Sequence, residues 1–171
     1  METREIFELV PQAAEQLPRG VFLTAGGDVW NPMTIGWAQF GMVWSRPVVT
    51  VLVRKSRFTY GLMEKADVFT VSVPRSGELK AELAFCGSKS GRDFNKEKES
   101  GLTRLPARAG GADGVAECGV FFECRIVQKV FGDLSEIDPA IRAKFYGANQ
   151  AFADGDPHEV YFGEVLAAYR K

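Results

Sequence analysis

The stretch WNPMTIGWAQFGMVW, residues 30–44, contains all three tryptophans of this 171-residue chain. Its proline and glycines, at positions 32, 36 and 41, weaken a helix interior, whereas its β-branched and aromatic residues favour a strand. Side chains alternate between the two faces of a strand, so Trp37 is predicted to point away from Trp30 and Trp44. The apolar residues change face midway, as in a long strand that bends at a glycine.

The tryptophan that faces away from the main core raises a question of function. Most aromatic side chains fill a core, which is the plain interpretation for each of the three. The one on the other face could instead stack on a planar ligand or lie at a subunit interface. The sequence of this stretch leaves both readings open.

Outward from this stretch, the chain predicts more strands and a few short helices. Gly26-Gly27-Asp28 would turn a hairpin between residues 20–25 and 30–44. A continuous apolar run at 48–53 predicts a strand buried on both faces. Further strands are predicted at 68–73, 117–130 and 158–169, helices at 58–65 and 76–85 and from Asp138-Pro139, and mostly loop at 91–114.

Two of these elements carry more detailed predictions. Ser76 would cap the helix 76–85, and Gly87 would end it. In 117–130, alternation predicts that Cys118, Val120, Phe122, Cys124 and Ile126 share one face, and that Glu117, Glu123, Arg125 and Lys129 share the other. Many strands with few helices indicate a mainly β protein, an antiparallel barrel or sandwich. No repeat or linker divides it, so residues 1–171 are predicted to form one domain.

Composition excludes several classes of partner. The chain has 21 basic and 22 acidic residues and a net charge of -1, which argues against nucleic acid or an anionic membrane. No apolar run approaches the ~18 residues of a membrane span, and the acidic N-terminus is unlike a secretory signal. A cytoplasmic protein is therefore predicted.

The cysteines and the histidine limit the chemistry. Cys86, Cys118 and Cys124 form no CxxC motif, so neither a zinc ribbon nor a thioredoxin-type site is indicated. His158 is the only histidine, which excludes a multi-histidine metal site. We predict no metal site. Cys86 could be reactive beside Lys89 and Arg92, or simply buried at the end of a helix.

One long span lacks acids. No acidic residue occurs between Asp28 and Glu64, while Arg46, Arg54, Lys55 and Arg57 fall inside this span. The last three lie where a strand runs into a helix that Ser56 or Thr59 could cap. Free N–H groups, hydroxyls and bases at a helix start suit an anion, phosphate above all. The alternative is a solvated basic turn.

A second basic segment is CGSKSGRDFNK, residues 86–96. Serines, glycines and bases after a helix could form an anion-binding nest, or the segment could be a mobile surface loop. The chain has no GxGxxG and no GxxxxGK[ST], so a Rossmann or Walker-type nucleotide site is not supported.

In their order along the chain, N-x-M-T-x-x-W, RPVVTVLVRKSRFT, CGSKSGRDFNK, GLT and HEVYFGEV resemble the motifs of the flavin reductase-like family. That family includes flavoredoxin and the flavin-reductase partners of two-component monooxygenases. The resemblance runs from about Gly20 to Ala168. It implies a Greek-key, FMN-binding split β-barrel, and a homodimer with the flavin near the subunit interface.

The resemblance also implies the cofactor-binding residues. The strand motif that lies against the isoalloxazine matches Asn31, Met33, Thr34, Ile35 and Trp37. The phosphate motif matches Arg54, Lys55, Ser56, Arg57 and Thr59, and a following motif matches Ser90, Gly91 and Lys96. His158 and Phe162 match the last strand motif. Glu97 departs from the family, which commonly has an aromatic residue at this position after the lysine.

By resemblance, NADH or NADPH would stack on FMN and pass a hydride to flavin N5. The protein would supply orientation, exclusion of water, and donors where negative charge develops, so no dedicated catalytic acid or base would be required. Three functions stay open: an NAD(P)H:flavin reductase, an electron carrier to another protein as flavoredoxin is, and a non-enzymatic flavin-binding module.

Overall fold

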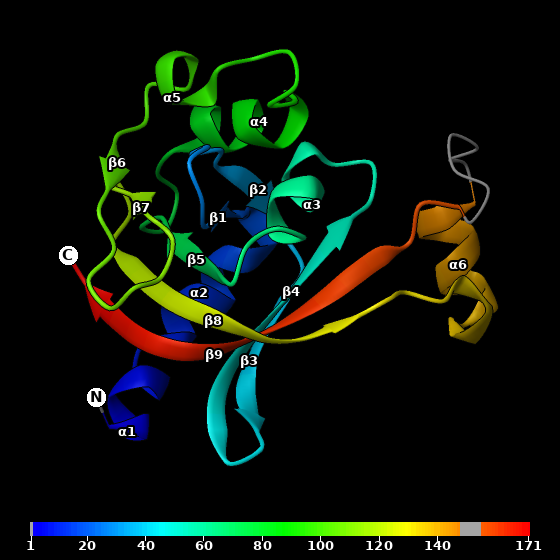
Figure 1. Cartoon of the computed structure of the whole chain (residues 1–171), viewed down its shortest axis with the longest axis horizontal. Coiled ribbons are helices and arrows are strands. Elements are labelled where there is room, and N and C mark those ends of the chain that lie inside the picture. The colour runs from blue at the N-terminus through cyan, green and yellow to red at the C-terminus, as the bar shows by residue number, and fades with distance from the viewer. Residues whose placement is uncertain (1, 148–154) are drawn as a thin grey trace.

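The computed structural model describes residues 2–147 and 155–171, and its centre is a seven-stranded antiparallel sheet (Figure 1). The strand order is β2-β1-β5-β8-β9-β4-β3. The strands are β1 Val21–Ala25, β2 Met33–Ile35, β3 Ala38–Val43, β4 Arg46–Arg54, β5 Val68–Val73, β8 Val120–Val130 and β9 His158–Arg170. A second sheet pairs β6 Arg104–Leu105 with β7 Gly114–Val115. The prediction of a mainly β protein is confirmed.

The sheet is strongly curled. Its two edge strands, β2 and β3, are separated in sequence only by Gly36 and Trp37, so the chain steps directly from one edge to the other. Register shifts in β8 mark two irregularities that go with such bending, and Gly163 on β9 lets the Phe69 ring approach closely. No hydrogen-bonded pair joins β2 to β3 in the residues described, so the ladder there stays open.

The predicted single strand over residues 30–44 is wrong. Trp30 lies before β2, buried, with its Nε1 donating to the Asp113 carbonyl at 3.1 Å. Trp37 sits in the step between the sheet edges. Trp44 is 57% exposed in the β3–β4 turn, where it and Ser45 both have positive φ. Instead of one bent strand, the stretch forms two separate strands, β2 and β3. β1 and β2 do pair with each other, as the hairpin prediction requires.

The predicted helices agree with the structure less well than the predicted strands do. α3 Phe58–Met63 and α6 Pro139–Tyr146 agree with prediction, and Asp138 caps α6 through the N–H groups of Ala140 and Ile141. α4 spans Lys80–Ser88, so Ser76 does not cap it and Gly87 does not end it. Instead, Gly77 has φ 83° and Ser76 donates to Glu15, which places both residues in a turn before the helix.

Glu123 on β8 is buried, although alternation predicted a solvent-facing position. Its carboxylate accepts hydrogen bonds from the N–H groups of Arg108, Ala109 and Gly111 and from the Tyr169 hydroxyl. The loop between β6 and β7, which precedes β8 in the chain, therefore covers β8 at Glu123, and its backbone N–H groups together with the Tyr169 hydroxyl satisfy the buried carboxylate.

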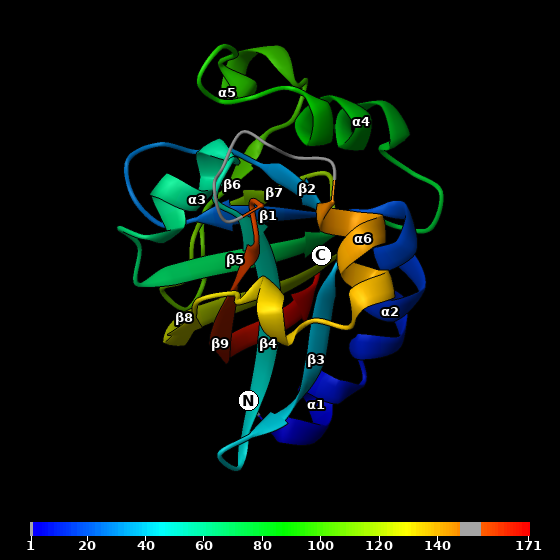
Figure 2. The same ribbon diagram turned by 90° about the vertical axis from the view of Figure 1, so that its right-hand side faces the viewer.

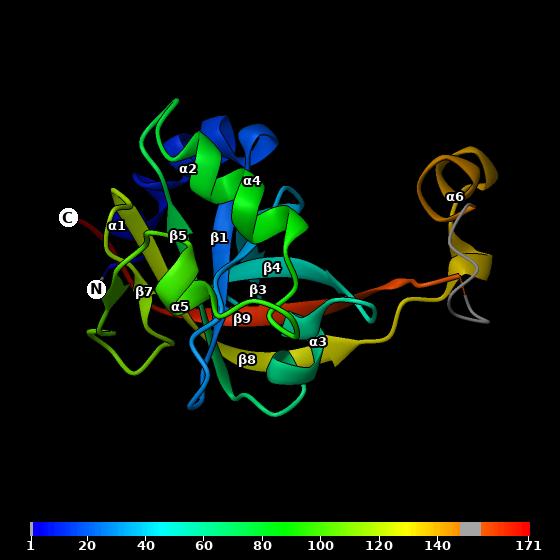
Figure 3. The ribbon, with the colours of Figure 1, turned by 90° about the horizontal axis from the view of Figure 1, so that it is seen from above.

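The remaining helices pack around the sheet. α1 Thr3–Phe7, α2 Val10–Gln16 and the 3₁₀ turn Leu17–Arg19 precede β1; α5 spans Lys96–Glu99, and a 3₁₀ turn spans Leu134–Glu136. α3, α4 and β2 gather at one end of the sheet (Figure 2), whereas α6 stands apart at the far end of the β8–β9 hairpin (Figures 1 and 3). None of the helices that the structure describes is both long and apolar enough to cross a membrane.

Candidate functional site

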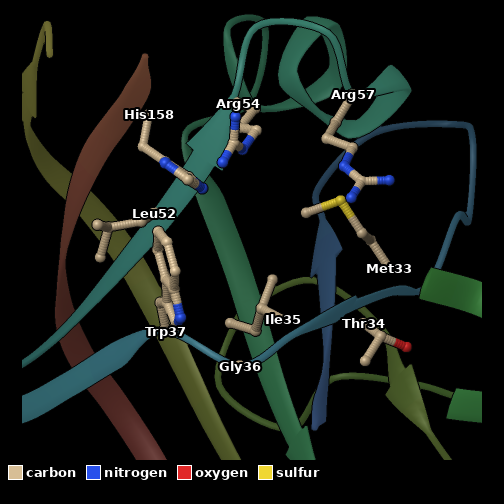
Figure 4. A pocket seen from close by; sticks show the side chains of 9 residues that line it. All are labelled: Met33, Thr34, Ile35, Gly36, Trp37, Leu52, Arg54, Arg57 and His158. Carbon is tan, nitrogen blue, oxygen red and sulfur yellow. The ribbon is translucent and has the colours of Figure 1, made fainter. Parts of the chain in front are cut away.

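Three adjoining cavities lie at the end of the sheet where β4 runs into α3. The first, which we call the strand-side pocket, has a volume of about 220 Å³. Arg54 and Arg57 lie along one side of it and Ile35 lies opposite them, while Trp37 and His158 lie next to each other at one end (Figure 4). Its full lining is Met33, Thr34, Ile35, Gly36, Trp37, Leu52, Arg54, Arg57 and His158.

The second cavity, the basic pocket, lies between the start of α3 and the segment 86–96 and has a volume of about 120 Å³. It shares Met33 and Arg57 with the strand-side pocket. Among the residues that the structure describes, four bases and no acid line it, so it is the most cationic of the three. The lining is Met33, Ser56, Arg57, Phe58, Thr59, Cys86, Ser88, Lys89, Ser90, Arg92 and Lys96.

The third, the outer cavity, is the largest at about 460 Å³, and it shares Phe58, Arg92 and Lys96 with the basic pocket. The three spaces therefore follow one another along the surface, with the smallest and most basic in the middle. The lining of the outer cavity is Asp28, Val29, Trp30, Asn31, Phe58, Gly91, Arg92, Asp93, Phe94, Asn95, Lys96 and Glu97.

Close packing holds the two basic segments together. Asn31 Nδ2 donates to Thr59 Oγ1 at 2.9 Å, and both side chains are buried. Gly91 sits against this pair: a Cβ there would lie 2.3 Å from Asn31 Oδ1 and 2.4 Å from Phe58 Cδ1. Arg92 Nη1 also donates to the Ser56 carbonyl at 3.0 Å. Only glycine fits at position 91, and the resulting contact joins the loop to α3.

Lys96 connects two segments of the chain through hydrogen bonds. Its buried Nζ donates to the carbonyls of Pro32 and Cys86 at 3.1 and 2.8 Å. Burial lowers the pKa of the Lys96 ammonium, and Arg57 nearby lowers it further. Cys86 is buried as well, and desolvation raises the pKa of its thiol to about 11. The plain interpretation of Cys86 as a buried, unreactive thiol therefore holds.

The basic span meets a carboxylate that the sequence did not point to. Asp156 is fully buried, and it accepts hydrogen bonds from the Ser56 N–H at 2.9 Å and the Ser56 hydroxyl at 2.7 Å. Arg54 Nη1 lies 3.8 Å from its Oδ2. The acid missing between Asp28 and Glu64 is thus supplied by a residue a hundred positions away, for which the sequence has no local signal.

His158 and Trp37 form an aromatic wall with the end of α6. The Trp37 ring centroid lies 4.8 Å from that of His158 and 5.2 Å from that of Phe145. Tyr146 OH and His158 Nδ1 are 2.8 Å apart. The pKa of His158 is lowered from 6.5 to about 4, mainly by burial. The charges of Arg54 and Arg57 also lower this pKa, whereas the Asp156 carboxylate raises it. The imidazole is therefore neutral at pH 7.

This shift predicts a pH-dependent stability. In the folded protein His158 stays neutral down to pH about 4, whereas in the unfolded chain it is protonated below pH 6.5. Between pH 4 and 6.5 the unfolded state therefore binds more protons than the folded state. The free energy of unfolding should fall as pH drops from 6.5 to 4. Urea titrations should show a smaller fall for His158→Gln than for the parent; equal pH dependence would contradict the shift.

Twelve of the fourteen residues predicted to bind cofactor line these cavities. They are Asn31, Met33, Thr34, Ile35, Trp37, Arg54, Ser56, Arg57, Thr59, Ser90, Gly91 and Lys96. Lys55 is half-buried outside all three. Phe162 is also outside, with its ring 6.1 Å from that of Trp44. Arg46, part of the same acid-free span, pairs with Glu164 at 2.8 Å, away from the cavities.

Comparison with known proteins gives consistent findings. The family description "Flavin reductase like domain" matches residues 14–171. An uncharacterized protein of Archaeoglobus fulgidus is 29% identical over 154 residues, which cover 90% of this chain and 85% of that one.

Two solved structures show the likeness in three dimensions. Flavoredoxin from Methanosarcina acetivorans is 25% identical with a TM-score of 0.65, covering 89% of this chain and 68% of its own. An NADH:FAD oxidoreductase from Streptomyces globisporus is 20% identical with a TM-score of 0.65, covering 100% and 87%, which is a likeness of fold.

Proposed function

Because the chain belongs to the flavin reductase-like domain family, we propose that it is an FMN-binding oxidoreductase, an NAD(P)H:flavin reductase that passes hydride from nicotinamide to flavin. The observation that supports this most directly is the arrangement of the first two cavities. A pocket walled by Trp37 and Ile35 adjoins a smaller one that, in the described part of the chain, is lined by four bases and no acid. FMN consists of a planar ring and a phosphate on a short chain. The ring would fit the first of these cavities, and the phosphate would fit the second.

The residues present fit FMN, with one adjustment to the predicted phosphate contacts. Ser56 offers neither its N–H nor its hydroxyl, because Asp156 accepts from both. Arg57, Lys89 and the Ser90 hydroxyl remain on the wall of the basic pocket. We infer that these groups would hold the phosphate, with Lys96 and Thr59 shaping the pocket from behind.

When bound, FMN would supply the redox chemistry, accepting a hydride from NADH or NADPH and passing its electrons to an acceptor. The side chains of this protein contribute position and charge. Trp37 and Ile35 would form the wall beside the ring and exclude water. Arg54 and Arg57 on the other side would stabilise negative charge on the flavin. Neutral His158 would act as a hydrogen-bonding wall rather than a cation.

The likeness to flavoredoxin supports a second candidate, an electron carrier that relays electrons between proteins. A non-enzymatic flavin-binding module is the third. An absorbance spectrum of the purified protein, taken without oxygen before and after adding NADH and NADPH, separates them. Bleaching of a yellow protein by nicotinamide supports the reductase, and bleaching only by a reduced protein supports the carrier. Bleaching by neither contradicts both.

The phosphate assignment makes a prediction about ligand preference. The parent should bind FMN at least tenfold more tightly than riboflavin, and Arg57→Ala should remove most of this preference, because a charge-assisted hydrogen bond contributes ~1.5–3 kcal/mol. Fluorescence quenching of each flavin measures it. Arg46→Ala is the matched control, since Arg46 belongs to the same basic span but pairs with Glu164. Equal affinity of the parent for the two flavins would contradict the assignment.

We also propose the family's split-barrel homodimer. The segment that projects beyond the end of the β8–β9 hairpin and carries α6, which we call the arm, supports this proposal. Phe131 is 67% exposed and Ile141 is 50% exposed on the arm that carries α6 (Figure 3). Apolar side chains so exposed on a projecting element fit a second copy of the chain.

The dimer is tested by light scattering. At micromolar concentration the parent should give about twice 18.8 kDa, because two copies would cover the apolar arm. Ile141→Asp should shift the mass toward the monomer, since a charge would be buried without a partner. Glu136→Gln, an exposed change on the same arm that introduces no new charge, should not. A monomeric parent with flavin bound would count against the dimer.

A further inference from the structure

The last turn of α6 contacts residues that line the strand-side pocket. Phe145 and Tyr146 are the last two residues of this helix. The Phe145 ring meets Trp37 edge-on, and the Phe145 carbonyl accepts a hydrogen bond from Arg54 Nη2 at 2.8 Å. The Tyr146 ring lies beneath the Arg54 guanidinium, whose central carbon is 4.9 Å from the ring centroid. A helix that follows Arg54 by more than eighty positions in the chain therefore helps to fix side chains of the pocket.

Tyr146 also holds His158. The two rings meet edge-on with centroids 5.6 Å apart, and the Tyr146 hydroxyl oxygen lies 2.8 Å from His158 Nδ1. From the start of β9, His158 points toward the pocket, near Arg54 (Figure 4). Because Nδ1 is engaged by Tyr146, the second ring nitrogen, Nε2, is the one that remains to interact with a ligand in the pocket.

The position of the imidazole proton follows from this contact. The pKa of His158 is about 4, so the ring is neutral at pH 7 and only one of its nitrogens carries a proton. Burial raises the pKa of Tyr146, so its hydroxyl keeps its own proton. Among the residues that the structure describes, His158 Nδ1 is the one acceptor within reach of that buried hydroxyl. An unpaired buried donor is costly, so Tyr146 donates to Nδ1 and the ring proton lies on Nε2.

We propose that Tyr146 is a positioning residue, which fixes His158 in the tautomer that presents Nε2–H to the strand-side pocket. The role of this donor toward a ligand rests on the proposed flavin function, whereas the tautomer is a property of the protein alone. Reduction by hydride adds negative charge to a flavin, and a fixed N–H donor stabilises that charge together with Arg54 and Arg57. Tyr146 therefore acts through His158 to favour reduced over oxidised flavin.

The tautomer is tested without flavin. His158 is the only histidine, so protein made with isotope-labelled histidine gives the nitrogen NMR signals of a single imidazole. At pH 7 the parent should show a protonated Nε2 and a bare Nδ1. Tyr146→Phe, which keeps the ring and loses the hydroxyl, should show a mixture of both tautomers. Tyr169→Phe is the matched control, because it removes a hydroxyl that donates to Glu123 outside the cavities, and it should resemble the parent. A proton on Nδ1 in the parent, or an unchanged tautomer in Tyr146→Phe, overturns the proposal.

The effect on the ligand is tested with FMN. The preference of the protein for reduced over oxidised FMN should be about tenfold weaker in Tyr146→Phe than in the parent, which lowers the two-electron midpoint potential by about 30 mV. Tyr169→Phe should keep the potential of the parent. An unchanged potential in Tyr146→Phe overturns the positioning role even if the tautomer shifts as expected. Failure of the parent to bind FMN contradicts the flavin function, and the positioning role falls with it, while the labelled-histidine spectra still decide the tautomer.

Discussion

Replacing Gly91 with alanine should weaken FMN binding by at least tenfold and lower the free energy of unfolding by ~1–3 kcal/mol. The new Cβ would lie 2.3 Å from Asn31 Oδ1 and 2.4 Å from Phe58 Cδ1, closer than any real contact allows. Asn31 is tied to Thr59, and Phe58 begins α3, so neither can simply swing away. Overpacking of this kind costs ~1–3 kcal/mol. The loop would have to move off α3, and the basic pocket between them would change shape.

A second glycine provides the control. Gly61 lies on α3 itself, and a Cβ built there meets none of the described residues within 4 Å. Gly61→Ala should keep the parent's FMN affinity and stabilise the fold by up to ~1 kcal/mol, because alanine favours a helix. Isothermal titration with FMN and urea unfolding measure both variants. If Gly91→Ala binds FMN like the parent, the loop does not form a wall of the phosphate site.

Local chemistry in the sequence predicted the parts of this site that depend on near neighbours. Residues 48–53 read as a buried strand because they form an unbroken β-branched run, and they lie in the middle of β4. The same holds for the helix after Arg57 and for Asp138 as the cap of α6. Each of these features is set by residues a few positions apart.

Features set by distant contacts could not be read in this way. Glu123 fits a solvent-facing alternation, but the loop that donates three N–H groups to it covers that face. The stretch 30–44 reads as one bent strand, because nothing local tells a bend from a step between the two edges of a curled sheet. Asp156 stands far from Arg54 and Ser56 in sequence, so the basic span looked free of acid until the fold brought them together.

Asp156 carries the second large expected effect, on stability. Asp156→Ala should lower the free energy of unfolding by ~2–4 kcal/mol, because it leaves the Ser56 N–H without an acceptor and the largely buried Arg54 guanidinium without its nearby carboxylate. Asp67→Ala is the control: that side chain is exposed and outside the cavities, so its loss should cost less than ~0.5 kcal/mol. Urea unfolding at pH 7 compares the three proteins.

The amide variant separates the structural role of Asp156 from its charge. Asp156→Asn keeps an oxygen that can accept from Ser56, so it should retain most of the stability that the alanine variant loses. It also removes a negative charge from beside a basic pocket, and the phosphate of FMN should then bind severalfold more tightly, since a unit charge near a protein surface changes such an interaction by ~1 kcal/mol or more. Riboflavin, with no phosphate, should show no such gain. Weaker FMN binding by Asp156→Asn at unchanged stability would mean that Asp156 orients the ligand-binding groups directly. Its assignment as a structural partner whose negative charge partly offsets the positive charge of the basic pocket would then be wrong.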